Sequence, residues 1–97
     1  SGPAYFLMLI ELLESCAVEL GLSAELAKEL AVQTAYGACK LARNASESPG
    51  ELRENVTSPN GTTEAALRVF AAEEIDRIVK SAVTAARDRS IELAKGN

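Results

Sequence analysis

The sequence predicts an all-α protein, a helical bundle of about five helices in which two copies of the chain interlock as a dimer. Hydrophobic residues make up 47% of the 97 residues, whereas aromatic residues make up 4% and Trp is absent. A core of small aliphatic side chains favours close packing of helices. Apolar residues recur at helical spacing and no linker is long enough to divide the chain. We therefore expect one helical domain over residues 1–97.

The first helix is expected from Pro3 to Leu20, because Pro suits the first helical position and Gly21 provides a stop. Residues 4–10 are apolar on every face of this helix, and such a helix must be covered on all sides. A domain of this size has too few other helices to provide the cover alone. A second copy of the chain is therefore expected to supply it.

The second helix is expected to begin after Ser23, its N-cap, and to run to about Ala45. Alanines recur along it at spacings of three and four, which makes a flat stripe that another backbone can approach closely. The sequence leaves open whether this stripe packs within one chain or forms a seam between two chains. The stripe consists of Ala27, Ala31, Ala35, Ala38 and Ala42.

A short third helix is predicted by Ser48, Pro49 and Glu51, which match the N-cap, N1 and N3 positions of a capping box. It is expected to end at a turn over residues 57–61. Residues 62–95 then contain neither Gly nor Pro, but a single helix of that length would far exceed the usual mean, so we expect a break within it. Solvated faces are indicated by acid-first pairs at i,i+4 spacing, namely Glu64/Arg68, Glu73/Arg77 and Asp76/Lys80.

The segment 55–64, Asn-Val-Thr-Ser-Pro-Asn-Gly-Thr-Thr-Glu, is the candidate functional site, because it places a hydroxyl-rich turn directly before a helix. Pro59 fixes its own φ, and we expect left-handed backbone geometry at Asn60 and Gly61. The amides of Thr62, Thr63 and Glu64 would then open a helix without intrahelical acceptors, where a carboxylate or phosphate fits. The alternative is an ordinary turn in which Thr62 is only an N-cap.

Composition excludes several other kinds of site. The formal net charge of −4 and a pI near 4.8 argue against nucleic acid or an anionic membrane as a partner. The chain has no His and only two cysteines, Cys16 and Cys39, so neither a Cys/His metal site nor a His-based catalytic triad is expected. Both cysteines fall on apolar helical faces, and a disulfide between them is the less favoured alternative. No signal peptide is recognised, and we expect a cytoplasmic protein.

The run Val56-Thr57-Ser58-Pro59-Asn60-Gly61-Thr62-Thr63 followed by Ala66-Leu67 resembles the signature near the C-terminus of pyrroline-5-carboxylate reductase. The resemblance extends over the whole chain, from residues 1–5 to Gln33-Thr34 and Gly37-Ala38 in the second helix. Asn60 stands where the family commonly has glycine. The family also breaks its last helical segment near a Gly-Gly-Phe sequence, whereas this chain has Glu73-Glu74-Ile75, so the position of the break is open.

The resemblance implies that the chain is the C-terminal dimerisation and substrate-binding domain of an oxidoreductase of proline biosynthesis. Such an enzyme reduces 1-pyrroline-5-carboxylate to L-proline with NADPH or NADH. The six glycines are too far apart to form a dinucleotide fingerprint, so the cofactor is expected on an N-terminal domain that this chain lacks, and no cofactor on this chain alone. This fragment alone is accordingly expected to be inactive.

By the same resemblance, the substrate-binding residues are Ser58, Gly61, Thr62 and Thr63, and Thr63 is also the catalytic residue. The amides of Thr62 and Thr63 and the Ser58 hydroxyl would contact the substrate carboxylate, while the Thr63 hydroxyl faces the ring nitrogen. A homodimer is expected, and its assembly into larger oligomers is open. The alternative function is a non-catalytic helical module for oligomerisation or partner binding, in which the turn is only a helix cap.

Overall fold

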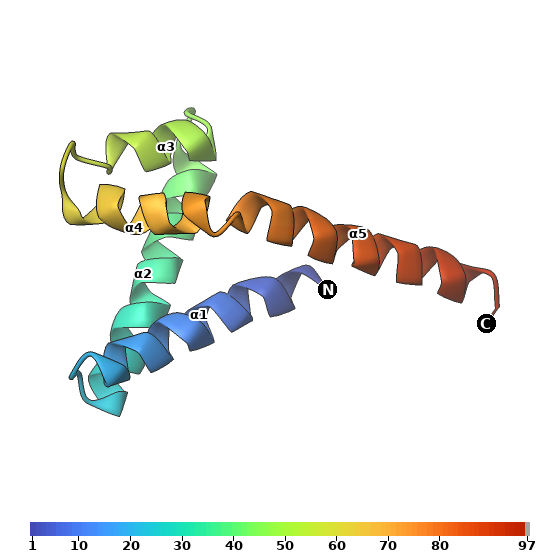
Figure 1. The fold of residues 1–97 in the computed structure, drawn as a ribbon, viewed down its shortest axis with the longest axis horizontal. Helices are drawn as coiled ribbons and strands as arrows, with labels where there is room; N and C mark the ends of the chain where they lie inside the picture. Colours follow the sequence, from blue (N-terminus) through green and yellow to red (C-terminus); the bar gives the residue numbers. More distant parts are fainter. Residues whose placement is uncertain (97) are drawn as a thin grey trace. The chain divides into compact units, whose positions relative to one another are not determined.

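A computed structural model describes residues 1–96 as five α-helices with no strand among them (Figure 1). The all-α class is therefore confirmed. The chain divides into two compact units, Ser1–Leu52 and Arg53–Asn97, and α3 runs across the division. The helices are α1 (Gly2–Glu19), α2 (Ala24–Asn44), α3 (Pro49–Asn55), α4 (Thr62–Ala72) and α5 (Ile75–Ala94).

The first unit is built on a hairpin of α1 and α2, which pack against each other. Gly21 makes the connection with a φ of 110°, a left-handed conformation that glycine adopts without steric cost. The Ser23 hydroxyl accepts a hydrogen bond of 3.2 Å from the Leu26 amide, which confirms the predicted N-cap of α2. Ala27 is 0% exposed and Ala31 is 8% exposed, so the first part of the alanine stripe packs within one chain.

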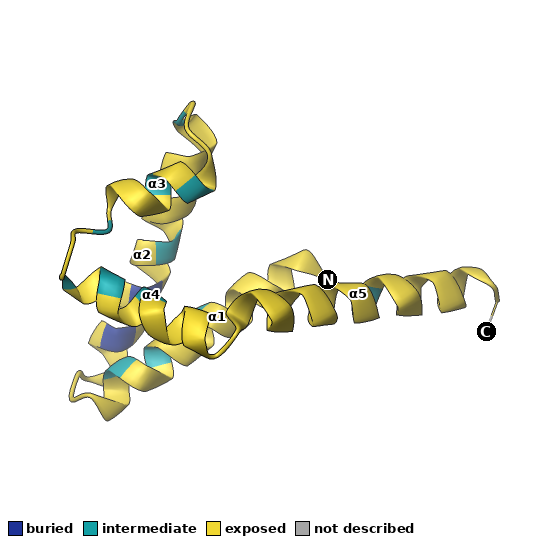
Figure 2. Cartoon of the chain, turned by 45° about the horizontal axis from the view of Figure 1, so that its top comes forward, coloured by how far each residue is buried: buried dark blue, intermediate teal, exposed yellow. Residues whose placement is uncertain are grey.

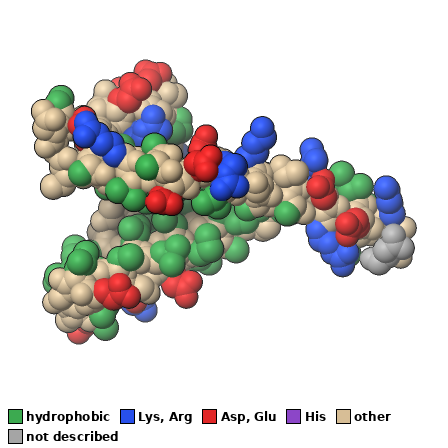
Figure 3. All heavy atoms as spheres, in the orientation of Figure 1, with side chains coloured by type: hydrophobic (Ala, Val, Ile, Leu, Met, Phe, Trp, Pro, Cys, Tyr) green, Lys and Arg blue, Asp and Glu red, His purple; other side chains and the backbone are tan. Residues whose placement is uncertain are grey.

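Most of the apolar surface of α1 is uncovered in the single chain. No residue of α1 is buried, and Phe6 and Leu7 are each 64% exposed. Hydrophobic side chains are visible along α1 in the space-filling view, and almost the whole chain has the colour of exposed residues in the burial view (Figures 2 and 3). Ala38 and Ala42, in the second half of the stripe, are also exposed. A contiguous apolar surface of this kind marks an interface.

The N-terminus of α3 has the predicted cap, with one difference in its bonding. The Glu51 amide donates to the Ser48 hydroxyl oxygen at 3.2 Å. The Glu51 carboxylate, however, accepts from the Ser48 hydroxyl at 3.1 Å, whereas in a full capping box it would accept from the Ser48 backbone N–H. The serine side chain therefore both receives and donates within the cap.

The break expected within residues 62–95 lies at Glu73 and Glu74, between α4 and α5. Glu74 has φ 58° and ψ 48°, a left-handed conformation that is uncommon outside glycine, and it precedes the first residue of α5. This break alters the expected charge pairs. Glu64 and Arg68 pair as expected, but Arg77 lies 3.5 Å from the carboxylate of Glu74 rather than pairing with Glu73, because the helical spacing does not continue through the break. The part of the chain that the structure describes shows no ion pair between Asp76 and Lys80.

The described residues 1–96 contain neither a disulfide nor a membrane-spanning helix. Cys16 and Cys39 are free thiols and are exposed in the single chain, so the less favoured disulfide is not formed. Measured by length and hydropathy, none of the five helices within residues 1–96 could span a bilayer.

Candidate functional site

The connection between α3 and α4 is a tight turn over Ser58, Pro59, Asn60 and Gly61. The Gly61 amide donates to the Ser58 carbonyl oxygen at 3.1 Å, which closes the turn. Pro59 stands at the second position, and Asn60 at the third has a φ of 61°. These are the features of a type II turn, which requires a positive φ at its third residue. The predicted turn is confirmed, and its left-handed residue is Asn60.

Gly61 does not have the expected left-handed geometry. Its φ is −91° and its ψ is −175°, an extended conformation that any residue can adopt. Space still restricts this position, because a β-carbon on Gly61 would lie 3.2 Å from the Ser58 carbonyl oxygen. The prediction of positive φ at Gly61 was therefore wrong. Only the third position of the turn needs that conformation, and Asn60 occupies it.

The first amides of α4 are open. Gly61 is the N-cap and makes no side-chain hydrogen bond to the helix, so Thr62 is the first helical residue and not the N-cap that the alternative interpretation gave it. Within residues 1–96, no acceptor is found for the backbone N–H of Thr62, Thr63 or Glu64. Thr62 and Thr63 are exposed. These donors lie at the positive end of the α4 dipole, where an anion is stabilised.

The hydroxyl groups of the segment separate into two kinds. The Thr57 hydroxyl donates to the Arg53 carbonyl oxygen at 2.6 Å, so it closes the C-terminus of α3 and has a structural role. The hydroxyls of Ser58, Thr62 and Thr63 have no protein partner within residues 1–96. These three hydroxyls of the segment thus remain available to a ligand.

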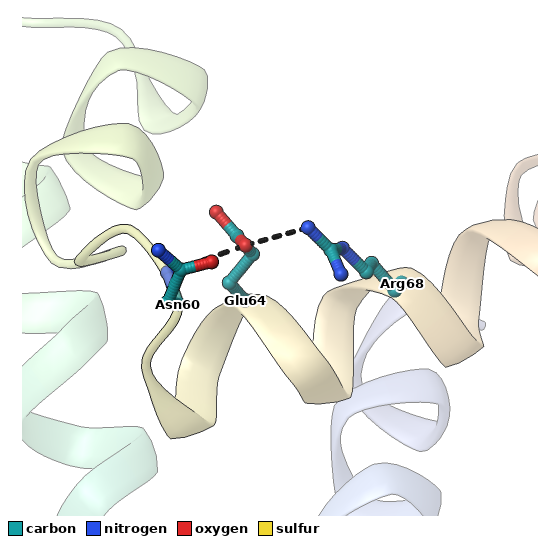
Figure 4. A network of polar contacts seen from close by, with 3 residues as sticks. All are labelled: Asn60, Glu64 and Arg68. Carbon is teal, nitrogen blue, oxygen red and sulfur yellow. Dashed lines mark hydrogen bonds and ion pairs between the residues drawn. The ribbon is translucent and has the colours of Figure 1, made fainter.

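The carboxylate of Glu64 is a part of this site that the sequence reasoning missed. Its Oε1 accepts from the Asn60 backbone N–H at 3.3 Å and from Nη2 of Arg68 at 2.8 Å, as Figure 4 shows. An acid three residues after the N-cap of a helix was the available signal, since that position commonly bonds back to the preceding turn. From the sequence, Glu64 was expected to contribute its backbone amide to the anion site and its side chain only to a solvated ion pair with Arg68.

The assembled site can bind one small carboxylate or phosphate without a charged side chain. Thr62 and Thr63 offer adjacent amides, and the nearby hydroxyls can donate further hydrogen bonds or orient the ligand. Ser58, Gly61, Thr62 and Thr63, the expected substrate-binding residues, all lie within this one turn and the first turn of α4.

Comparison with known proteins decides the family. Residues 1–93 match the sequence profile described as pyrroline-5-carboxylate reductase dimerisation. The chain belongs to this family. The resemblance carried by the turn is thereby confirmed over nearly the whole chain.

Relatives and solved structures of pyrroline-5-carboxylate reductases agree with the profile. The chain is 48% identical over 95 residues to the pyrroline-5-carboxylate reductase of Pseudomonas aeruginosa, covering 98% of this chain and 35% of that protein. The structure of a pyrroline-5-carboxylate reductase from Coxiella burnetii matches with a TM-score of 0.92 and 42% identity, over 96% of this chain and 34% of that one. The Plasmodium falciparum pyrroline carboxylate reductase with NADP bound matches with a TM-score of 0.88 and 35% identity, over 92% of this chain and 34% of that one.

The chain thus spans about a third of the length of the curated relatives it matches, 35% for the Pseudomonas protein and 32% for a Bacillus subtilis pyrroline-5-carboxylate reductase. The matched part is the dimerisation domain of the family. The open amides of α4 and the turn before them therefore lie in a dimerisation domain of pyrroline-5-carboxylate reductase.

Proposed function

We propose that this chain is the C-terminal, substrate-binding and dimer-forming domain of an enzyme that reduces 1-pyrroline-5-carboxylate to L-proline. The observation that carries the proposal is the pair of open amides at Thr62 and Thr63 beside free hydroxyls. This arrangement suits a substrate that has a single carboxylate on a small ring. Membership of the reductase family supports this choice among small anions.

Each group of the site has a separate role in this proposal. The amides of Thr62 and Thr63 and the Ser58 hydroxyl hold the substrate carboxylate, and Gly61 leaves room for the turn to close against Ser58. The Thr63 hydroxyl faces the ring nitrogen and hydrogen-bonds it as its lone pair develops during reduction. A neutral hydroxyl does this without placing a cation beside a protonated imine. Holding the ring in one orientation is the main contribution of these residues to the rate.

NADPH or NADH would supply the hydride in such an enzyme, and this chain's own residues offer no matching site for either cofactor. A dinucleotide fold requires a glycine-rich turn between a strand and a helix. The glycines at positions 2, 21, 37, 50, 61 and 96 are scattered, and the described residues 1–96 contain no strand. In this proposal the cofactor binds to a separate dinucleotide-binding domain of the enzyme, N-terminal to this one.

The reductase activity itself tests the proposal. An enzyme in which this chain follows a dinucleotide-binding domain (the joined enzyme) is expected to oxidise NADPH or NADH only when 1-pyrroline-5-carboxylate is added. The isolated chain is expected to be inactive and to give no heat of binding when either cofactor is titrated into it in a calorimeter. Saturable cofactor binding by the isolated chain, or a joined enzyme that leaves the substrate unreduced, would overturn the assignment.

A homodimer is the second part of the proposal, and the exposed apolar surface of α1 supports it. Phe6, Leu7 and Met8 are 64%, 64% and 56% exposed in the single chain, more apolar surface than a monomer usually leaves in water. The partner that a dimerisation domain offers is a second copy of itself. Light scattering after size exclusion is expected to give twice the 10.2 kDa mass of one chain. A stable monomer at micromolar concentration would contradict an interlocked dimer.

The alternative function, a non-catalytic helical module, is favoured by no particular feature of the site. In that case the turn would be only a helix cap. The open amides and unpartnered hydroxyls around Thr62 and Thr63 would then have no role. The substitutions argued in the Discussion separate the two functions.

A further inference from the structure

The carboxylate of Glu64, in the first turn of α4, accepts a hydrogen bond from the backbone of the turn that precedes this helix. Its Oε1 lies 3.3 Å from the Asn60 backbone nitrogen and 2.8 Å from Nη2 of Arg68. All three groups lie within the unit that begins at Arg53. In the close-up, the side chain of Glu64 lies between Asn60 and Arg68 (Figure 4). Oε1 of Glu64 therefore accepts hydrogen bonds from both Asn60, the left-handed residue of the turn, and Arg68, which lies further along α4.

This bond differs from the usual capping box, in which the acid bonds to the N–H of the N-cap residue itself. Here the N-cap is Gly61, and its N–H is already used in closing the turn against the Ser58 carbonyl oxygen. Glu64 therefore bonds one residue further out, to Asn60. That residue has a φ of 61°, a conformation that most side chains disfavour. The bond thus acts at the residue of the turn that most needs to be held in place.

Arg68 keeps this carboxylate in place and offsets its charge. The side chain of Glu64 is 30% exposed whereas that of Arg68 is 75% exposed, so the arginine contributes little stability as an exposed ion pair. Its position still matters, because an unpaired carboxylate three residues after Gly61 would repel an anion at the amides of Thr62 and Thr63. The turn thus has a carboxylate acceptor that is paired with a guanidinium group.

We propose that Glu64 is a positioning residue for the substrate carboxylate, acting through its hydrogen bond to the Asn60 amide. The bond holds Asn60 in its left-handed conformation, and the conformation of the turn sets the direction of the Thr62 and Thr63 amides toward the ligand. This proposal rests on the function proposed above, since it concerns the same anion site. Glu64 itself does not touch the substrate.

Kinetics of the joined enzyme test the positioning role. Glu64→Ala removes the acceptor and is expected to raise the KM for 1-pyrroline-5-carboxylate about three- to tenfold. The kcat is expected to change less than about twofold, because the substrate carboxylate is held equally in the ground state and the transition state. Glu64→Gln retains an amide oxygen as acceptor, so its KM is expected to stay within about twofold of the wild type. Glu92→Ala is the matched control, since it breaks the exposed Arg89–Glu92 pair of α5 and is expected to leave both constants unchanged.

Amide hydrogen exchange of the chain itself tests the bond without any enzyme assay. The Asn60 amide is expected to exchange about three- to tenfold faster in Glu64→Ala than in the wild type or in Glu64→Gln. The Thr57 amide, which donates to the Glu54 carbonyl oxygen, is the internal reference and is expected to keep its rate. Circular dichroism would verify that each variant has the helix content of the wild type.

The outcomes separate this proposal from the function on which it rests. Unchanged exchange of Asn60 in Glu64→Ala would overturn the hydrogen bond, whatever the enzyme does. Faster exchange with an unchanged KM would overturn the positioning role, as would an equal rise of KM in the alanine and glutamine variants. A wild-type enzyme that fails to reduce the substrate would overturn the function, while the exchange rates would still decide whether Glu64 holds Asn60.

Discussion

Thr63→Val in the joined enzyme is expected to lower kcat/KM about ten- to a hundredfold, which corresponds to the loss of one well-placed hydrogen bond of about 1.4 to 2.7 kcal/mol. Valine keeps the shape of threonine and the backbone amide of residue 63 at the start of α4. The contact to the substrate carboxylate should therefore be partly retained. The hydroxyl that faces the ring nitrogen is the group that is lost, and steady-state kinetics with 1-pyrroline-5-carboxylate would measure the effect.

Two further variants control for changes unrelated to this hydroxyl. Thr63→Ser restores a hydroxyl and is expected to recover most of the rate. Thr84→Val makes the same chemical change at an exposed position of α5 and is expected to have no kinetic effect. A kinetically silent Thr63→Val would mean that the hydroxyl does not meet the ring nitrogen, and the helix-cap alternative would be favoured.

The helix boundaries could be predicted because caps and stops act locally. Ser23 and Ser48 bond to amides three residues ahead, at Leu26 and Glu51, as their positions in the sequence required. Gly21 ends the first hairpin helix because its φ of 110° is one that glycine accepts freely. Local chemistry of this kind depends on few neighbours, so a single sequence is enough to place it.

The break between α4 and α5 was harder to place because no residue type marks it. The residue at the break is Glu74, which adopts a left-handed conformation with φ 58° despite its side chain. Neither Gly nor Pro marks the end of α4 in the sequence. The expected Glu73/Arg77 pair failed for the same reason, because a spacing of four residues brings side chains together only within one continuous helix. Glu74 lies nearer to Arg77 once the helix restarts.

The candidate site was predicted correctly as a turn before a helix, but its internal geometry was not. Proline at the second position is compatible with type I and type II turns, and only the type II turn requires a positive φ at the third residue, which here is Asn60, while Gly61 is extended. The use of Glu64 as an acceptor depends on the N–H of Gly61 being already bonded. That competition between donors becomes visible only when the turn has three-dimensional coordinates.

Asn60→Val is expected to raise the KM for 1-pyrroline-5-carboxylate tenfold or more, because it forces a β-branched side chain into left-handed geometry. Residue 60 has a φ of 61°, and such a conformation costs about 1–3 kcal/mol for a residue that resists it. The turn would relieve this cost by changing conformation. The Gly61 bond to Ser58 and the aim of the Thr62 and Thr63 amides would then be lost together.

Asn60→Gly is the matched control for this substitution, since glycine occupies φ near 60° without steric cost. Its KM is expected to remain within about twofold of the wild type, and the glycine variant also shows whether the asparagine side chain itself matters. Size exclusion with light scattering would verify that both variants keep the oligomeric state of the wild type, since residue 60 lies in the turn and not on α1. An Asn60→Val enzyme with unchanged KM would mean that the left-handed residue does not set the direction of the amides. The turn would then be a connector between α3 and α4, and the anion would have to bind elsewhere.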